Sequence, residues 1–369
     1  RRPNPAKNER AAASRSAPPE MRIALPATVN GQIMPGEVDR FRFAARQGQR
    51  LVVAASARAL IPYLPDAVPG WFQATLALFD ARGNELQYAD DYRFHPDPVL
   101  FYEIPKDGDY TIAIKDSIYR GREDFVYRLA VGELPFVTSI FPLGGPAGAP
   151  ATVELKGWNL RVTHVLVDTQ APGVRPLKVR QDDPLSNPML FAVDTLPEAV
   201  EQEPNHPAGR EQTVTLPLIV NGRIDPPGDT DRFRFEGHAG STIVAEIFAR
   251  RLNSPLDSVL KLTDATGRQL AFNDDHEDKG AGLTTHHADS RLSAVLPASG
   301  DYFLQLTDAQ RKGGAEYAYR LRLSAPQPDF DLRVVPSSLT LRGGGTVPFT
   351  VYALRKDGCS NEIALALKD

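Results

Sequence analysis

One nine-residue phrase occurs twice in the sequence, and this repetition constrains the fold more than any other feature. Residues 35–43 read PGEVDRFRF and residues 227–235 read PGDTDRFRF. Four pairs of segments, the first of which contains this phrase, match in order: 29–58 with 220–250, 76–91 with 260–275, 104–116 with 296–308, and 124–132 with 316–324. Matching blocks separated by connections of unequal length indicate two copies of one strand framework with variable loops.

Within the matched segments, apolar side chains recur at every second position. In the RFRF half of the second phrase, Phe233 and Phe235 fall on one face of an extended strand, and Arg232 and Arg234 fall on the other. The tetrapeptide DARG in the first copy and DATG in the second separate alternating runs and are typical of hairpin turns. The sequence therefore predicts two β-sandwiches with the Phe side chains inside.

Composition supports an all-β fold with several cores. The 369 residues include 32 Pro and 28 Gly but only 3 Met, which favours short strands and turns over long helices.

The net charge of −4 gives no basic field for a phosphate backbone, so nucleic acid is not expected as a partner. Cys359 is the single cysteine, which excludes an intrachain disulfide. No apolar run is long enough to span a membrane.

Several motifs of the second copy resemble the bacterial pre-peptidase C-terminal domain, called PPC. They are ExEPN at 201–205, NGRI at 221–224, GDTDRF at 228–233 and LPASGDYFLQLTD at 296–308, and residues 22–132 resemble a more divergent PPC copy. The stretch between the copies, with TSIFPLGG and VELKGWNL, is similar to IPT/TIG immunoglobulin-like modules. The order of modules resembles that of large exported proteins of planctomycete-type bacteria.

The resemblance implies jelly-roll-like β-sandwiches that accompany secreted enzymes and surface proteins without being catalytic. Some PPC domains bind Ca²⁺, and those of collagenases bind collagen. The expected organisation is a flexible arm at 1–21, PPC-like sandwiches at 22–133 and 198–325, an IPT/TIG-like module at 134–197, and the truncated start of a further Ig-like module at 326–369. Because the chain starts at Arg1 without a signal-peptide pattern, we expect a longer protein with its targeting segment outside this sequence.

Acidic side chains of the second copy predict a structural Ca²⁺ site, because this ion takes about six to eight oxygen ligands. Glu201, Glu203 and Asn205 lie two residues apart and share one side of an extended segment. Asp229 and Asp231 are spaced in the same way in the turn before the repeated strand. Residues 198–205 lead into the second copy, and we call them its lead-in segment. If this segment crosses the turn, five oxygen-bearing side chains converge. Alternatively, the aspartates form turn hydrogen bonds and the glutamates are solvated.

The first copy offers a poorer version of this site. It has Glu37 and Asp39 at the corresponding turn, but only Glu20 in its lead-in segment. In the second copy, His206 stands where a further oxygen ligand would complete the ion's shell. We therefore expect calcium in the second copy and leave the first copy open.

A second polar site is a further possibility in the second copy. It would comprise Asn273, Asp274 and Asp275 after a hairpin, with Asp257 and Asp289 as neighbours. Such clusters more often cap turns and stay hydrated.

Two irregular loops are candidates for ligand contact. One carries Tyr63 and Trp71, although Trp71 can equally close the end of a core. The other carries His276, His286 and His287. Adjacent His286 and His287 point to opposite sides of an extended chain, which disfavours a zinc site.

No nucleophile motif such as GxSxG is present, so we expect the chain not to be an enzyme. The leading prediction is a non-catalytic adhesion, targeting or spacer segment of a larger exported bacterial protein, located in the periplasm, at the cell surface or outside the cell. Its partners would be other domains of the same polypeptide and an extracellular glycan or protein. The alternatives are a carbohydrate- or protein-binding module with a defined pocket, and an accessory part of a secreted hydrolase whose catalytic domain lies elsewhere.

Overall fold

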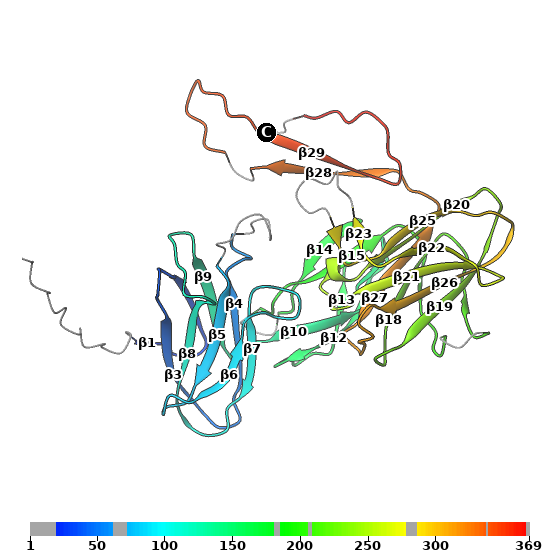
Figure 1. Cartoon of the computed structure of the whole chain (residues 1–369). Coiled ribbons are helices and arrows are strands. Elements are labelled where there is room, and N and C mark those ends of the chain that lie inside the picture. Colours follow the sequence, from blue (N-terminus) through cyan, green and yellow to red (C-terminus); the bar gives the residue numbers. More distant parts are fainter. Residues whose placement is uncertain are drawn as a thin grey trace, which may run out of the picture. The chain divides into compact units, whose positions relative to one another are not determined.

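Nearly all regular structure among the described residues is β-strand (Figure 1). The computed structural model describes residues 20–61, 72–180, 185–205, 209–277, 286–336 and 339–366. It divides into two compact units, Arg1–Leu134 and Pro135–Asp369. The predicted all-β class with tandem β-sandwiches is confirmed. The described residues contain no helix with the length and apolar character needed to cross a bilayer.

The first unit is a sandwich of a five-stranded and a four-stranded sheet. The five-stranded sheet has, in spatial order, β1 (Glu20–Arg22), β3 (Asp39–Ala45), β8 (Gly108–Asp116), β5 (Ala74–Phe79) and β6 (Glu85–Ala89). The four-stranded sheet has β2 (Ala27–Gln32), β9 (Val126–Gly132), β4 (Arg50–Ser56) and β7 (Val99–Glu103). One cluster of buried apolar side chains draws on both sheets. Strand β1 begins at Glu20, inside the segment expected to be an arm, and residues 1–19 lie outside the described residues.

The second unit contains a larger sandwich. One of its sheets has β17 (Gln212–Thr213), β19 (Thr230–Gly237), β26 (Gly300–Asp308), β21 (Ser258–Asp264) and β22 (Gln269–Asn273). The other has β16 (Glu198–Val200), β18 (Leu218–Arg223), β27 (Ala318–Ser324), β20 (Thr242–Phe248) and β25 (Arg291–Val295). The strand orders of the two sandwiches correspond strand for strand, except that β16 is an additional edge strand of the second.

Two smaller sheets lie between the sandwiches in sequence. They consist of β10 (Phe136–Phe141), β12 (Ala151–Trp158) and β13 (His164–Val167), and of β11 (Gly144–Pro146), β15 (Met189–Asp194) and β14 (Gly173–Leu177). We call residues 135–194 the insert. Its core cluster also includes Leu252 from the 3-10 turn η1 (Arg250–Leu252) and Ala318 of β27. The insert and the second sandwich therefore share buried apolar surface.

The remaining strands form two hairpin-like pairs. Strands β23 (His276–Glu277) and β24 (His286–His287) pair antiparallel beyond the end of β22. Strands β28 (Asp329–Val335) and β29 (Thr350–Lys356) pair antiparallel near the C-terminus. These two strands are the ones found among the described residues of the segment expected to begin a further Ig-like module.

The repeated RFRF strand behaves as its alternation predicts. Phe233 and Phe235 in β19 are 0% and 1% exposed and lie in the core of the second sandwich. The predicted hairpin turns are also confirmed, since β21 and β22 pair antiparallel on either side of DATG. Within that turn Asp264 Oδ1 accepts hydrogen bonds from the backbone N–H groups of Thr266 and Arg268.

Two aromatic substitutions test which residues support this sandwich. Phe235→Ala leaves a cavity in the core and should lower the free energy of unfolding by about 3–5 kcal/mol. Phe272→Ala is the matched control, because Phe272 is 52% exposed and its loss should change stability by less than about 0.5 kcal/mol. Hydrogen exchange of β19 and β26 in the full chain, measured across a urea series, reports the stability of the second sandwich in both variants. Equal losses for the two variants would contradict the assigned core.

Candidate metal site

An additional edge strand delivers the first acidic residue of the site. Strand β16 runs parallel to β18, with Val200 opposite Asn221. Directly after it, the backbone N–H of Glu201 donates to the carbonyl oxygen of Asn221 at 3.0 Å. The backbone N–H of Arg223 donates to Oε1 of Glu201 at 2.6 Å. Sheet pairing thus fixes both the backbone and the carboxylate of Glu201.

The carboxylates of Glu201 and Asp231 meet at the hydroxyl of Tyr319. Tyr319 in β27 and Asp231 in β19 come from opposite sheets, and both are 0% exposed. The Tyr319 hydroxyl lies 2.5 Å from Oδ2 of Asp231 and 2.7 Å from Oε2 of Glu201. Gly222 makes room for this approach, because a Cβ atom there would stand 2.3 Å from both Oε2 of Glu201 and the Tyr319 ring. The lead-in segment, β19 of one sheet and β27 of the other therefore meet at one buried point.

Glu203 completes a cluster of three acidic residues. One carboxylate oxygen from each of Glu201, Glu203 and Asp231 lies within 4.8 Å of the other two. The backbone N–H of Asn205 donates to Oε2 of Glu203 at 3.0 Å, so Asn205 adjoins the cluster. Both side-chain polar atoms of Asn205 and Oδ1 of Asp231 are buried with no hydrogen-bond partner among the described residues. Buried polar atoms without partners are rare and signal a missing ligand, ion or water.

Burial and mutual repulsion make the cluster electrostatically unfavourable by itself. Desolvation, followed by the charge of Glu201, raises the pKa of Asp231 from its ordinary 3.8 to about 10. Desolvation also raises the pKa of Glu201, against the hydrogen bond from Tyr319. The pKa of Tyr319 lies well above its ordinary value because the ring is buried beside these carboxylates. A cation at this point would offset the repulsion.

Asp229, the fifth predicted ligand, is engaged with its own turn. Its Oδ1 accepts from the backbone N–H of Thr230 at 2.7 Å and its Oδ2 accepts from that of Asp225 at 3.2 Å. It does not belong to the group of carboxylates within 4.8 Å. The structure thus brings Glu201, Glu203 and Asp231 together, places Asn205 beside them, and gives Asp229 the turn-capping role that was the alternative.

The first sandwich contains half of the same arrangement. The Tyr127 hydroxyl donates to Oδ2 of Asp39 at 2.5 Å, and Gly31 lies against the Tyr127 ring as Gly222 does against Tyr319. Glu20 takes no part, since its carboxylate lies 3.8 Å from Arg42. Glu37 accepts from the backbone N–H of Met34 at 2.8 Å. No group of three possible ligands forms in the part of this sandwich that the structure describes.

The residues of the predicted second polar site serve the framework instead. Asp289 is buried and accepts from the backbone N–H groups of Ala249, Arg250 and Arg251 and from the Arg251 side chain. Asp257 lies 3.7 Å from Arg250.

The other three members of that site lie at the surface turn after β22. Asn273 Oδ1 accepts from the backbone N–H of Arg291, and its Nδ2 donates to the carbonyl oxygen of Asp275. Asp274 Oδ1 accepts from the N–H of Asp275. These hydrogen bonds match the turn-capping alternative.

The predicted ligand-contact loops are described only in part. Tyr63 and Trp71 lie outside the described residues, and the side chain of His286 is not described. The rings of His276 and His287 lie beside each other across the β23–β24 pair, with centroids 5.3 Å apart and planes inclined by 53°. Desolvation and the charge of Arg251 lower the pKa of His287 to about 4.

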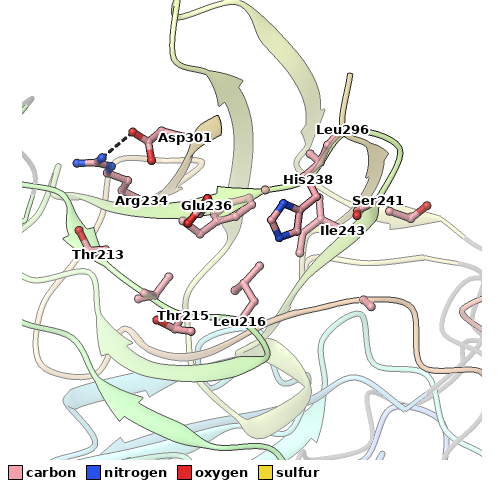
Figure 2. Close-up of a pocket in the computed structure, with 15 residues that line it drawn as sticks. Thr213, Thr215, Leu216, Arg234, Glu236, His238, Ser241, Ile243, Leu296 and Asp301 are labelled. Carbon is pink, nitrogen blue, oxygen red and sulfur yellow. Dashed lines mark hydrogen bonds and ion pairs between the residues drawn. The ribbon is translucent and has the colours of Figure 1, made fainter. Parts of the chain in front are cut away.

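A separate groove of about 590 Å³ lies at another place on the second sandwich (Figure 2). Thr213, Thr215 and His238 line it with the ion pair of Arg234 and Asp301, whose charged atoms are 2.5 Å apart. None of the clustered carboxylates lines the groove. Its one Phe, Phe235, is buried, so the described lining residues offer no exposed aromatic platform of the kind expected for binding a sugar ring.

Sequence reasoning missed Tyr319, Gly222 and Arg223. Tyr319 and Gly222 recur at the same places in the first copy as Tyr127 and Gly31, within the matched strand segments. Their repetition was a usable signal, because a buried Tyr requires a hydrogen-bond partner. The contacts of Arg223 could not be seen in the sequence, since they depend on the pairing of β16 with β18.

No family model matches the chain. A stretch of 82 residues is 42% identical to a protein named probable subtilase-type serine protease from Deinococcus radiodurans, covering 22% of this chain and 10% of that protein. The chain thus spans about a tenth of the length of this curated relative.

Two solved structures are also similar. The pre-peptidase C-terminal domain of a Bacillus anthracis collagenase matches 31% of this chain and 97% of that domain, at 15% identity and a TM-score of 0.24. The Aeromonas hydrophila protein PliG, a periplasmic inhibitor of g-type lysozyme, matches 31% and 98%, at 15% identity and a TM-score of 0.23. At these scores the likenesses do not identify the family.

The buried Asp231 predicts how stability depends on pH without metal. An acid with a raised pKa keeps a proton in the folded state that the unfolded chain releases, so stability falls as the pH rises from 3.8 towards about 10. In a chelator, Asp231→Asn should weaken this fall and stabilise the second sandwich increasingly at higher pH. Chemical denaturation of the full chain at several pH values measures the free energy of unfolding of wild type and of Asp231→Asn.

Asp39→Asn in the first sandwich is the matched control for this experiment. Desolvation and the charge of Glu37 also raise the pKa of Asp39, but Glu37 is exposed, whereas Glu201 beside Asp231 is partly buried, so the effect of Asp39→Asn should be smaller. If Asp231→Asn destabilises the metal-free protein above neutral pH, the assigned repulsion is wrong.

Proposed function

We propose that the chain is a non-catalytic accessory segment of a larger exported bacterial protein, and that its second sandwich binds a structural Ca²⁺ ion. The ion would be held by Glu201, Glu203, Asp231 and Asn205. The observation that carries the proposal is the cluster of three carboxylates within 4.8 Å, two of whose residues are joined to a buried tyrosine. In this role the segment serves adhesion, targeting or spacing.

The donor set suits a hard cation. Carboxylate and amide oxygens are the ligands that Ca²⁺ prefers, and Ca²⁺ tolerates flexible geometry. Oδ1 of Asp231 and the side-chain amide of Asn205 are buried without protein partners among the described residues. Glu203 is exposed, which leaves room for water ligands beside it. No thiolate or imidazole belongs to this group of three.

The ion would hold the lead-in segment on the sandwich. Strand β16 has only three residues and pairs with one neighbour, so its backbone pairing is weak alone. Glu201 and Glu203 follow it directly, whereas Asp231 belongs to the opposite sheet. Bridging these residues with Ca²⁺ would fasten the connection that leads from the insert into the sandwich.

The place of the segment in a larger protein is supported by the curated relative. That protein is named a subtilase-type serine protease, and the matched 82 residues are 10% of its length. A small module of a long peptidase is consistent with an accessory role, in which the sandwiches position or tether another domain. The other domains of the same polypeptide are the partners proposed for the sandwiches in this role.

Calorimetric titration of the full chain with CaCl₂ tests the site. Wild type should bind one ion in the second sandwich, and Glu201→Gln should lower the affinity at least about tenfold, because one charged ligand is lost. Glu236→Gln is the matched control, since Glu236 is an exposed carboxylate on β19 that lines the separate groove. Residues 198–205 should also become more resistant to protease with Ca²⁺. Absence of calcium heat in wild type, or equal affinity in Glu201→Gln, contradicts the proposal.

A further inference from the structure

A short hairpin of the second sandwich places two histidines opposite each other. Strands β23 and β24 pair antiparallel in the register His276 with His287 and Glu277 with His286. Neighbours along one strand point to opposite faces, but directly opposed residues of two strands share a face, with Cβ atoms about 4.5–5.5 Å apart. The partner of His287 is therefore His276 across the hairpin and not the adjacent His286.

The spacing of the two rings fits one bound metal ion. Their centroids are 5.3 Å apart and their planes are inclined by 53°. Zinc binds imidazole nitrogen at about 2.0–2.1 Å with tetrahedral geometry, which places two ring centres roughly 5 Å apart. The observed separation of the two ring centres matches this value.

The surroundings of His287 leave a ring nitrogen unused. Its Nδ1 is buried and has no hydrogen-bond partner among the described residues. The nearby positive charge of Arg251 is compensated, because Arg251 contacts Glu246 at 3.1 Å and Asp289 at 2.8 Å. Repulsion of a dication by this guanidinium is correspondingly reduced.

The first sandwich has the same turn without the second imidazole. Asp97 there accepts from the backbone N–H groups of Arg58 and Ala59, as Asp289 does from those of Ala249 and Arg250. Two residues before each aspartate stands a histidine, His95 or His287. The strand partner of His95 is Tyr92, where the second sandwich has His276. The histidine pair is therefore specific to the second sandwich.

We propose that His276 and His287 form a binding site for a transition-metal dication of the zinc class. Imidazole nitrogens favour such borderline ions, whereas Ca²⁺ prefers the oxygens of the carboxylate cluster. Two imidazoles supply half of a tetrahedral shell, and water completes it. The site is independent of the proposed calcium site in both residues and ligand chemistry.

Calorimetric titration of the full chain with ZnCl₂, in excess CaCl₂ near neutral pH, tests the site. Wild type should bind one zinc ion at this hairpin. His276→Tyr installs the residue pair of the first sandwich and should weaken zinc binding at least about tenfold, since even partners that only support a ligand are worth about 10–100-fold. His238→Ala, an exposed histidine in the groove of Figure 2, is the matched control and should bind zinc as wild type does.

Two further variants distinguish the proposed zinc site from other zinc sites. Glu201→Gln should retain zinc binding, and its loss there would place zinc at the carboxylates and overturn the proposal. His286→Ala should also retain it, and a loss confined to that variant would overturn the assigned pairing. Circular dichroism checks that the variants fold, and the visible absorption of Co²⁺ in wild type and His276→Tyr provides a readout independent of heat. Saturable zinc binding that His276→Tyr leaves unchanged, or no saturable binding in wild type, rejects the site.

Discussion

The contact of the Tyr319 hydroxyl with two carboxylates is the interaction on which the second sandwich depends. Tyr319 and Asp231 come from facing sheets, and Glu201 comes from the segment that leads into them. A single hydroxyl proton cannot satisfy both acceptors at once. One carboxyl must therefore keep a proton or share a cation, and burial makes either solution preferable to two bare charges. The same contact that joins the two sheets thus favours either a retained proton or a bound cation.

Comparison with the first sandwich shows which contacts belong to the fold of both copies and which belong to the proposed metal site of the second. The first sandwich retains the buried tyrosine, the aspartate and the closely packed glycine, as Tyr127, Asp39 and Gly31. It has no counterpart of β16 among the described strands, and no group of three possible metal ligands forms in its described part. Aspartates that cap loops also recur, since Asp116 and Asp308 each accept several backbone N–H groups. Shared contacts of this kind maintain the fold, whereas the added edge strand and the longer hairpin distinguish the second copy.

Sequence reasoning was effective where a local pattern determines the outcome. Period-two alternation predicted the inward Phe233 and Phe235, and the DATG turn predicted the hairpin of β21 and β22. The acidic spacing also predicted that Glu201, Glu203 and Asp231 come together if the lead-in segment crosses the turn, and their carboxylates do lie within 4.8 Å of one another. It could not separate Asp231 from Asp229, two residues away, since which of the two enters the core depends on strand register. The pairing of His276 with His287 was hidden for the same reason, because contacts across a hairpin do not follow from neighbours along one strand.

The connection between the insert and the second sandwich explains why a metal at Glu201 would have consequences beyond its own ligands. Arg223 donates its backbone N–H to Glu201, while its guanidinium contacts Glu154 at 2.6 Å and lies 3.9 Å from the centre of the Phe141 ring. Glu154 and Phe141 both belong to the insert. One residue therefore links the proposed ion to the neighbouring module through a hydrogen bond, an ion pair and a cation–π contact. An ion that holds Glu201 in place also holds the backbone of Arg223, whose side chain contacts the insert.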